Sequence, residues 1–241
     1  RFHYVFLIIL SLSYALTGMN VLLIGAVLPS IKLEWKLDDV SSGLLLSAGY
    51  AGMAIGAVSS GLLSDRIGRK KTLMAMLAIM SILTAMCAFA RDVYSMSLLR
   101  FLAGIGLGGS LPIPGVYMSE YPPAKYRGRF VGLVETAWVY GSLLSLVFSY
   151  FLIPLYGWQN TFLVALLPLA LVPLVAFKIP ESIRYLEEKG RFEEAKGIVV
   201  RLDFMKENDV VTTTMEKSKH GISDLFSKEY LKRTTVLWIT W

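Results

Sequence analysis

Charged residues are scarce in this sequence. Of its 241 residues, 17% are charged and 55% are hydrophobic, and the mean hydropathy is +0.57. Soluble globular domains carry about 25% charged residues. The composition therefore argues against a water-soluble enzyme and indicates an integral membrane protein, since six spans of about 20 apolar residues fit within this length and leave room for one polar segment.

Cysteine and histidine are almost absent. The single cysteine, Cys87, lies in an apolar run, so it cannot form an internal disulfide and says nothing about the redox compartment. The two histidines, His3 and His220, are too few for a histidine-rich metal cluster. No trio of nucleophile, base and orienting residue stands out. We therefore expect no metal, no cofactor and no enzymatic active site.

Apolar stretches recur along the chain up to residue 177. Six of them approach the length of about 20 residues that crosses a bilayer. Helices are the expected structure, because backbone groups in lipid must be satisfied within the segment and the alternation of barrel strands does not occur. The predicted spans cover residues 4–31, 40–63, 72–90, 93–118, 131–156 and 162–177.

Basic residues are distributed unequally between the two sides of these spans. Most of the 24 Lys and Arg residues lie at the N-terminus, in the loops after the second and fourth spans, and after the sixth. The opposite side carries only Lys32, Lys36 and Arg91. The positive-inside rule therefore places the N-terminus and the basic loops in the cytoplasm of a cell membrane protein. Because topology explains the basic charge, we expect no nucleic-acid partner.

The composition divides the chain into three segments. Residues 1–178 hold the six predicted spans of a transmembrane bundle. Residues 179–233 are polar, with some apolar residues at helical spacing, and we predict a cytoplasmic central loop with short amphipathic helices. Residues 234–241 turn apolar again, which predicts the start of a seventh transmembrane helix. The first residue is not methionine, so we expect a fragment of a longer protein.

A short charged turn joins the second and third spans. Its sequence combines two glycines, a carboxylate and four cations and runs Gly61-Leu-Leu-Ser-Asp65-Arg66-Ile-Gly68-Arg69-Lys70-Lys71. A positive-inside anchor would explain the cations but neither the carboxylate nor the glycines. At every defining position the turn resembles the signature loop of the major facilitator superfamily, G-x-x-x-D-R-x-G-R-K/R.

Three further stretches resemble motifs of the same superfamily. The run R-F-L-A-G-I-G-L-G-G from Arg100 is similar to a glycine-rich helix motif, and Glu120 with Arg127 resembles the E-x6-R loop of sugar and organic-acid porters. The run P-E-S-I-R-Y-L from Pro180 resembles the P-E-S-P-R-W/Y-L box, with Ile183 in place of the usual proline. The four motifs occur in the right order and at the right topological places.

The resemblance implies an all-α membrane protein in which this chain supplies the six-helix N-terminal bundle of a twelve-helix fold, with the C-terminal half of the same transporter as its partner. It implies a secondary active transporter that moves a small polar organic solute, a sugar or an organic acid, by alternating access with protons as the coupled ion. The motif residues would form a conformational gate: Gly61, Asp65, Arg66, Gly68, Arg69, Glu120, Arg127, Glu181 and Arg184.

Glycines on two predicted spans fall at spacings of three and four residues. They form one stripe on each helix, and they are Gly49, Gly52 and Gly56 on the second span and Gly104 and Gly108 on the fourth. Such stripes let a neighbouring backbone approach closely. We expect static packing there, although the same smooth surfaces could also slide during transport.

Two ionisable residues lie inside predicted spans. Arg100 is about 10 Å from the outer end of the fourth span and Glu135 about 9 Å from the inner end of the fifth. Each is unfavourable by several kcal/mol unless it is paired or faces water, so both are functional candidates. The alternatives are a structural anchor for Arg100, bonded to carbonyls or waters, and a buried neutral carboxyl for Glu135.

Polar residues accompany Glu135 along one face of the fifth span, where Trp138, Ser142, Ser145 and Ser149 follow at helical offsets. A polar stripe of this length would be unfavourable against lipid, so we predict that it lines a central cavity. On the first span Ser13, Thr17 and Asn20 keep similar spacing, and we expect them to face the same cavity. Tyr14 and Trp138 could stack on a solute ring or serve only in packing.

At one point that bears on proton coupling, the sequence departs from the pattern of the superfamily. Many proton-linked relatives carry an acidic residue in the first span, whereas this sequence has Thr17, Gly18, Met19 and Asn20 there and no carboxylate in that span. Glu135 is then the best proton carrier in this half, because burial raises a carboxyl pKa toward neutrality. An uncoupled facilitator of the same fold and a carrier-derived sensor without net flux stay open as alternatives.

Overall fold

Helices make up the described part of the chain. The computed structural model describes residues 2–121, 126–201 and 235, and every regular element in these ranges is helical, which confirms the all-α fold class. In chain order the elements are α1 (Phe2–Trp35), α2 (Asp39–Ile67), α3 (Arg69–Met86), η1 (Cys87–Phe89), α4 (Val93–Ser110), α5 (Pro112–Glu120), α6 (Arg127–Thr161), η2 (Phe162–Ala170), α7 (Leu171–Lys178), α8 (Ile183–Glu188) and α9 (Phe192–Arg201).

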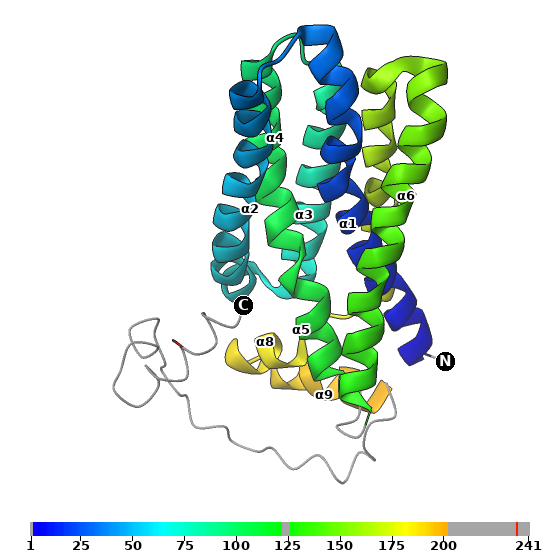
Figure 1. The fold of residues 1–241 in the computed structure, drawn as a ribbon. Coiled ribbons are helices and arrows are strands. Elements are labelled where there is room, and N and C mark those ends of the chain that lie inside the picture. The colour runs from blue at the N-terminus through cyan, green and yellow to red at the C-terminus, as the bar shows by residue number, and fades with distance from the viewer. Residues whose placement is uncertain (1, 122–125, 202–234, 236–241) are drawn as a thin grey trace. The chain divides into compact units, whose positions relative to one another are not determined.

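Among the described residues, five helical stretches are long and apolar enough to cross a membrane. The fifth, Arg127–Lys178, has 52 residues, whereas a single crossing takes about 20. Its helix is interrupted at Gly157, where φ is 81° and ψ is 164°, a conformation that favours glycine. The chain turns back at the end of α6, so that η2 packs beside it (Figure 1). The fifth stretch therefore supplies both predicted spans, 131–156 and 162–177.

Capping residues start two of the membrane helices. Asp38 accepts a hydrogen bond from the Ser41 backbone N–H at 3.0 Å, and Asp92 accepts one from the Ser95 N–H at 2.8 Å. These bonds satisfy N–H groups that have no partner within the helix. Hydrogen bonds from Ser41 lower the pKa of the Asp38 carboxyl, and the bond from the Ser95 backbone N–H lowers that of Asp92. Both helices therefore begin at a residue that the local sequence specifies.

Glycines bring α2 and α4 into backbone contact. A Cβ atom built at Gly52 would clash with the Phe101 carbonyl, and one at Gly108 would clash with the Met53 carbonyl. Only hydrogen fits at these positions, as in other close helix pairs of membrane proteins. The packing role expected for the two glycine stripes is confirmed.

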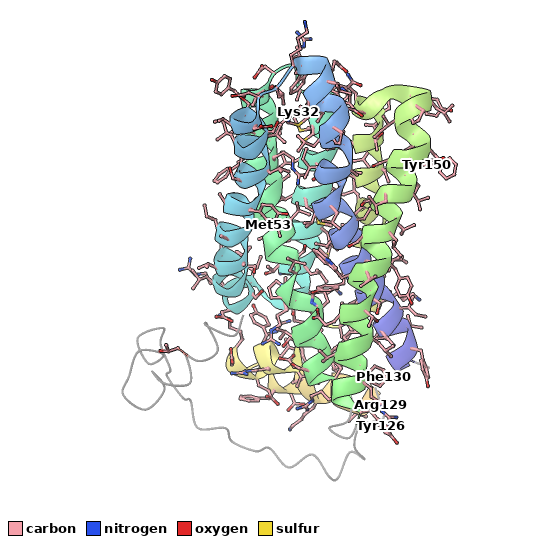
Figure 2. The ribbon with its side chains drawn as sticks, in the orientation of Figure 1. Lys32, Met53, Tyr126, Arg129, Phe130 and Tyr150 are labelled. Carbon is pink, nitrogen blue, oxygen red and sulfur yellow. The ribbon has the colours of Figure 1, made fainter. Side chains whose placement is uncertain are left out.

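Apolar side chains cover much of the outside of the helices. Phe151 is 60% exposed and Tyr150 75% exposed, and Figure 2 shows Tyr150 projecting outward from α6. Lys32 lies at one end of the bundle and Arg129 at the other, so labelled charged side chains flank the apolar zone (Figure 2). An apolar exterior between charged ends is typical of an integral membrane protein.

The polar segment after α7 forms short helices against one end of the bundle. Figure 1 shows α8 and α9 crossing that end, and the Tyr185 hydroxyl of α8 donates to the Arg66 carbonyl at 3.2 Å. This contact places α8 next to the turn between α2 and α3. Residues 202–233 of the predicted loop lie outside the described residues, as does the predicted start of a seventh span at 234–241 except for residue 235. The predicted division of the chain into three segments stays a prediction.

Candidate functional site

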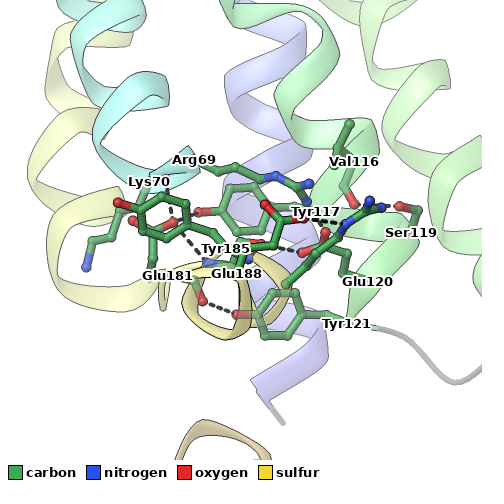
Figure 3. A network of polar contacts seen from close by, with 12 residues as sticks. Arg69, Lys70, Val116, Tyr117, Ser119, Glu120, Tyr121, Glu181, Tyr185 and Glu188 are labelled. Carbon is green, nitrogen blue, oxygen red and sulfur yellow. Dashed lines mark hydrogen bonds and ion pairs between the residues drawn. The ribbon is translucent and has the colours of Figure 1, made fainter. Parts of the chain in front are cut away.

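An ion pair joins the α2–α3 turn to the end of α5. Arg69, the first residue of α3, pairs with Glu120, the last residue of α5, and the two side chains are 16% and 14% exposed. The second carboxylate oxygen of Glu120 accepts a hydrogen bond from Ser182 Oγ at 2.7 Å. Figure 3 shows Arg69 and Glu120 within one network of polar contacts. The shielded pair therefore connects three segments that are far apart in sequence.

Glu181 caps the first turn of α3 from a distant part of the chain. Its carboxylate accepts hydrogen bonds from the backbone N–H groups of Lys70 at 3.1 Å and Ser182 at 2.9 Å. A carboxylate at a helix N-terminus is favoured by the helix dipole. The Tyr121 hydroxyl donates to the Glu181 carbonyl at 2.6 Å, and burial with the nearby charges of Glu120 and Glu181 raises the pKa of Tyr121. The phenol therefore stays a hydrogen-bond donor at neutral pH.

Gly68 makes this capping arrangement possible. Its φ of 99° lies in the region that favours glycine, and a Cβ atom there would clash with the Glu181 carboxylate. Because Gly68 has no side chain, the N-cap position of α3 is open to Glu181. We call Gly68, Arg69, Glu120, Glu181 and Ser182 the turn cluster.

The structure leaves the other motif residues outside the turn cluster. Gly61, Asp65, Arg66 and Arg127 are exposed, and Arg184 is paired with Glu188 at 3.1 Å on the surface. Glu120 of the E-x6-R motif thus pairs with Arg69 of the α2–α3 turn. Of the nine predicted gate residues, the structure brings together Gly68, Arg69, Glu120 and Glu181.

Sequence reasoning missed the polar side chains that complete this network. Ser182, Tyr117, Tyr121 and Tyr185 all donate hydrogen bonds to its members or to the adjoining turn. The spacing of Tyr117 and Tyr121, four residues apart, was the available signal, since it places both phenols on one helix face.

A second cluster lies between α1 and α6. The Tyr14 hydroxyl donates to Glu135 Oε2 at 2.7 Å, and the Tyr14 and Trp138 rings lie 5.7 Å apart at an angle of 55°. Trp138 in turn packs against Gly18, where a Cβ atom would lie 3.0 Å from the indole. We call Tyr14, Glu135 and Trp138 the Glu135 cluster. Glu135 is exposed on this helical unit, and the alternative of a buried neutral carboxyl in the complete protein stays open.

Arg100 lies on α4 and is 3% exposed. Its Nε and Nη1 atoms have no hydrogen-bond partner among the described residues. Described carbonyls therefore do not hold these two atoms, and an anchor bonded to waters stays open as the alternative. Arg100 borders a void of about 10 Å³ between α1, α2 and α4. Within the described ranges no ion pair joins it to Glu135.

The polar residues of α1 do not share the exposed face of Glu135, contrary to expectation. Thr17 is 1% exposed and Asn20 is 0% exposed. Thr17 Oγ1 donates to the Ser13 carbonyl at 2.9 Å, and Asn20 Nδ2 donates to the Leu16 carbonyl at 3.0 Å. Helical spacing fixes which residues share a face, but it does not say which neighbour that face meets. Bonds to the preceding turn let these groups pack inside the unit.

The serines of α6 turn progressively inward. Ser142 is half-buried and Ser145 and Ser149 are buried, whereas Glu135 of the same predicted stripe is exposed. Ser149 borders a surface hollow of about 310 Å³ with Tyr150, beside α1. Neither Glu135 nor Arg100 borders this hollow, so the central cavity that they were expected to share stays a prediction.

Comparison with known proteins gives the family. The family model described as "Sugar (and other) transporter" matches residues 6–241. The chain is 37% identical over 246 residues to the niacin transporter NiaP of Acinetobacter baylyi, covering 100% of this chain and 56% of NiaP. It is 34% identical over 247 residues to the gallate transporter of Pseudomonas putida, covering 100% of this chain and 55% of that protein. The chain thus spans about half the length of these relatives.

A solved structure gives the fold. The proton:xylose symporter XylE, of the major facilitator superfamily, was solved with bound 6-bromo-6-deoxy-D-glucose and matches with a TM-score of 0.76. The identity is 23%, and the match covers 86% of this chain and 50% of XylE. The likeness confirms the predicted fold, and the match to a transporter family confirms that the chain is not an enzyme. This chain therefore belongs to the family described as "Sugar (and other) transporter", and it has the fold of the major facilitator superfamily.

Proposed function

We propose that this chain forms half of a secondary carrier that moves a small organic acid across the membrane by alternating access. The Glu135 cluster is the observation that carries the proposal. It presents an ionisable group within a membrane span, exposed on the helical unit and held by the Tyr14 hydroxyl. An ionisable residue facing lipid is strongly unfavourable, so this face borders a wet path in the complete protein.

The proposed solute class is an aromatic carboxylic acid. Niacin and gallate, which give two relatives their names, both combine an aromatic ring with a carboxyl group. The tilted rings of Tyr14 and Trp138 offer aromatic surface on which such a ring could stack. A sugar is the competing solute, since the family and the structural relative are named for sugars.

Protons are the proposed coupled ion, with Glu135 as their carrier. The first predicted span, residues 4–31, contains no carboxylate, and Glu135 lies well inside the fifth stretch of Arg127–Lys178. One proton carried with one carboxylate makes the transport step electroneutral. An uncompensated charge would instead feel the membrane potential, which is worth about 2.3 kcal/mol per 100 mV.

The turn cluster is proposed to keep this helical unit rigid while it rocks against a second one. The Arg69–Glu120 pair and the Glu181 cap tie the α2–α3 turn to α5 and to the segment before α8. Asp65 and Arg66 are exposed beside these contacts, where they would latch one end state through the other half of the carrier. The excess of basic residues at this end supports a cytoplasmic position.

Counterflow in proteoliposomes that contain the complete carrier tests the proposal. We expect uptake of radiolabelled niacin or gallate that rises when a proton gradient is imposed. Solute exchange that does not depend on pH would indicate an uncoupled facilitator. Solute binding without transport would indicate a carrier-derived sensor. Uptake of xylose with no uptake of either acid would contradict the proposed solute class.

A further inference from the structure

The guanidinium of Arg100 is buried without a counter-charge. The side chain is 3% exposed, and the ionisable groups that act on it electrostatically are the Cys87 thiol and the Tyr50 phenol. No described carboxylate pairs with Arg100. A positive charge is therefore held inside the helical unit uncompensated by its described neighbours.

The hydrogen-bonding capacity of Arg100 is also unfilled. Its Nε and Nη1 atoms are shielded from solvent and have no partner among the described residues. Buried donors on a charged group are strongly unfavourable when they stay unpaired. An acceptor that carries a negative charge would satisfy both the donors and the charge.

The structure has a space for such an acceptor next to these donors. Arg100 borders the void of about 10 Å³, whose other lining residues are Val21, Ile24, Leu46, Gly49, Tyr50 and Met53. A void of this size holds about one water molecule. A Cβ atom at Gly49 would lie 3.6 Å from Nη2 and 3.7 Å from Nε, so glycine keeps the approach to the guanidinium open.

We propose that Arg100 is the binding residue for a monovalent anion, and that in the working carrier this anion is the carboxylate of the solute. The identification of this anion with the carboxylate of the solute rests on the proposed function. Arginine suits this role, because its planar guanidinium pairs with carboxylates through charge-assisted hydrogen bonds. The small void marks the place at which the anion would contact the guanidinium. Chloride is the other monovalent anion that could supply the negative charge and the hydrogen-bond acceptor.

The test compares niacin with its neutral amide on the purified complete carrier. We expect wild-type protein to bind the acid more tightly than the amide, and Arg100→Gln to weaken acid binding about tenfold or more with little change for the amide. One such charge-assisted contact is of this order. Isothermal titration calorimetry measures the affinity for both ligands. The affinity of Arg100→Lys for the acid should lie between those of the wild type and Arg100→Gln.

Gly49→Ala keeps the result interpretable where Arg100→Gln fails to fold. The added methyl group meets the guanidinium at van der Waals distance, so it narrows the site while it leaves the charge in place. We expect it to weaken acid binding selectively. Gly43→Ala, on the same helix with nothing within 4 Å of the new Cβ, is the matched control and should change neither ligand.

Thermal stability in chloride and in gluconate separates the two sources of the anion. One outcome is that chloride stabilises the wild-type protein but not Arg100→Gln, while niacin does not change the stability of the wild type. This outcome would support the anion site and contradict the proposed organic-acid function. The anion site would be overturned if neither niacin nor chloride stabilised the wild-type protein. It would also be overturned if either anion stabilised the Arg100→Gln variant as much as it stabilises the wild type.

Discussion

Three charged groups of this chain lie in three different environments. Arg69 is shielded but paired with Glu120, Arg100 is buried without a described counter-charge, and Glu135 is exposed within a membrane span. Charge burial is tolerated when it is paired and is otherwise a strong indication of function. At the scale of single residues, the environment therefore separates a structural charge from two candidate transport residues.

Glu135→Gln should abolish proton-driven accumulation while it spares solute exchange. The amide keeps the size of the side chain and can still contact Tyr14, but it cannot carry a proton. A pH difference of about one unit is worth about 1.4 kcal/mol and sustains about a tenfold accumulation, which the variant should lose. Uptake of labelled niacin with and without a pH gradient measures this, and an unchanged gradient dependence would exclude Glu135 as the proton carrier.

Glu120→Ala should destabilise the protein by about 3 kcal/mol, because it leaves the shielded Arg69 without its partner. Glu188→Ala is the matched control, since its pair with Arg184 is exposed and should contribute less than about 1 kcal/mol. Denaturant unfolding in detergent measures both changes. Equal effects of the two substitutions would show that burial does not strengthen the Arg69–Glu120 pair.

Glycines decide how the elements meet. At Gly52 and Gly108 the missing side chain permits backbone contact between α2 and α4, and at Gly157 a positive φ interrupts a 52-residue apolar stretch. At Gly68 both reasons apply, because the residue has a positive φ and lies against Glu181. The same residue type therefore packs helices in one place and ends them in another.

Gly68→Ala should destabilise the contact between the α2–α3 turn and Glu181. A side chain at a φ of 99° is strained by about 1–3 kcal/mol, and the new Cβ would displace the Glu181 carboxylate from the first turn of α3. Hydrogen exchange at the Lys70 amide, which donates to Glu181, reports the loss of this cap.

Gly61→Ala in the same motif is the matched control. Gly61 lies in α2, where a Cβ atom meets nothing within 4 Å, so alanine should be neutral or add up to about 1 kcal/mol of helix stability. If Gly68→Ala behaved like Gly61→Ala, the proposed cap at α3 would not depend on the glycine.

For the whole molecule, the described helices form a unit whose two ends differ. One end holds the turn cluster and α8, and the other is tied by the Trp158 indole N–H, which donates to Glu34 at 2.6 Å. A unit braced at both ends can move as one body, which is what alternating access by rocking requires. The exposed Asp65 and Arg66 lie at the end with the turn cluster.

Asp65→Asn should change the rate of solute exchange by about fivefold or more while folding and membrane insertion stay as in wild type, since a latch biases the equilibrium between end states. Asp39→Asn, at the opposite end of α2 in a surface pair with Lys32, is the matched control and should leave the rate unchanged. Exchange of labelled solute across proteoliposomes checks both. A wild-type rate in Asp65→Asn would contradict the latch.

Local sequence was enough to predict much of this fold. The six predicted spans follow from runs of apolar residues, because each must match the thickness of a bilayer. The pairing of Arg69 with Glu120 was not predictable, because residue spacing does not say which loop lies beside which. The burial of Thr17 and Asn20 was also missed, because their polar spacing fits an inward face and a cavity face equally well.

The sequence by itself determined that this is a helical membrane protein of a transporter superfamily, because hydropathy and short motifs act locally along the chain. Only the tertiary structure decided which ionisable groups are paired. It placed Glu135 on an exposed face beside Tyr14, and it left Arg100 buried beside a small void. Pairing depends on which helix faces meet across the bundle, and that is set by the packing of all the helices together.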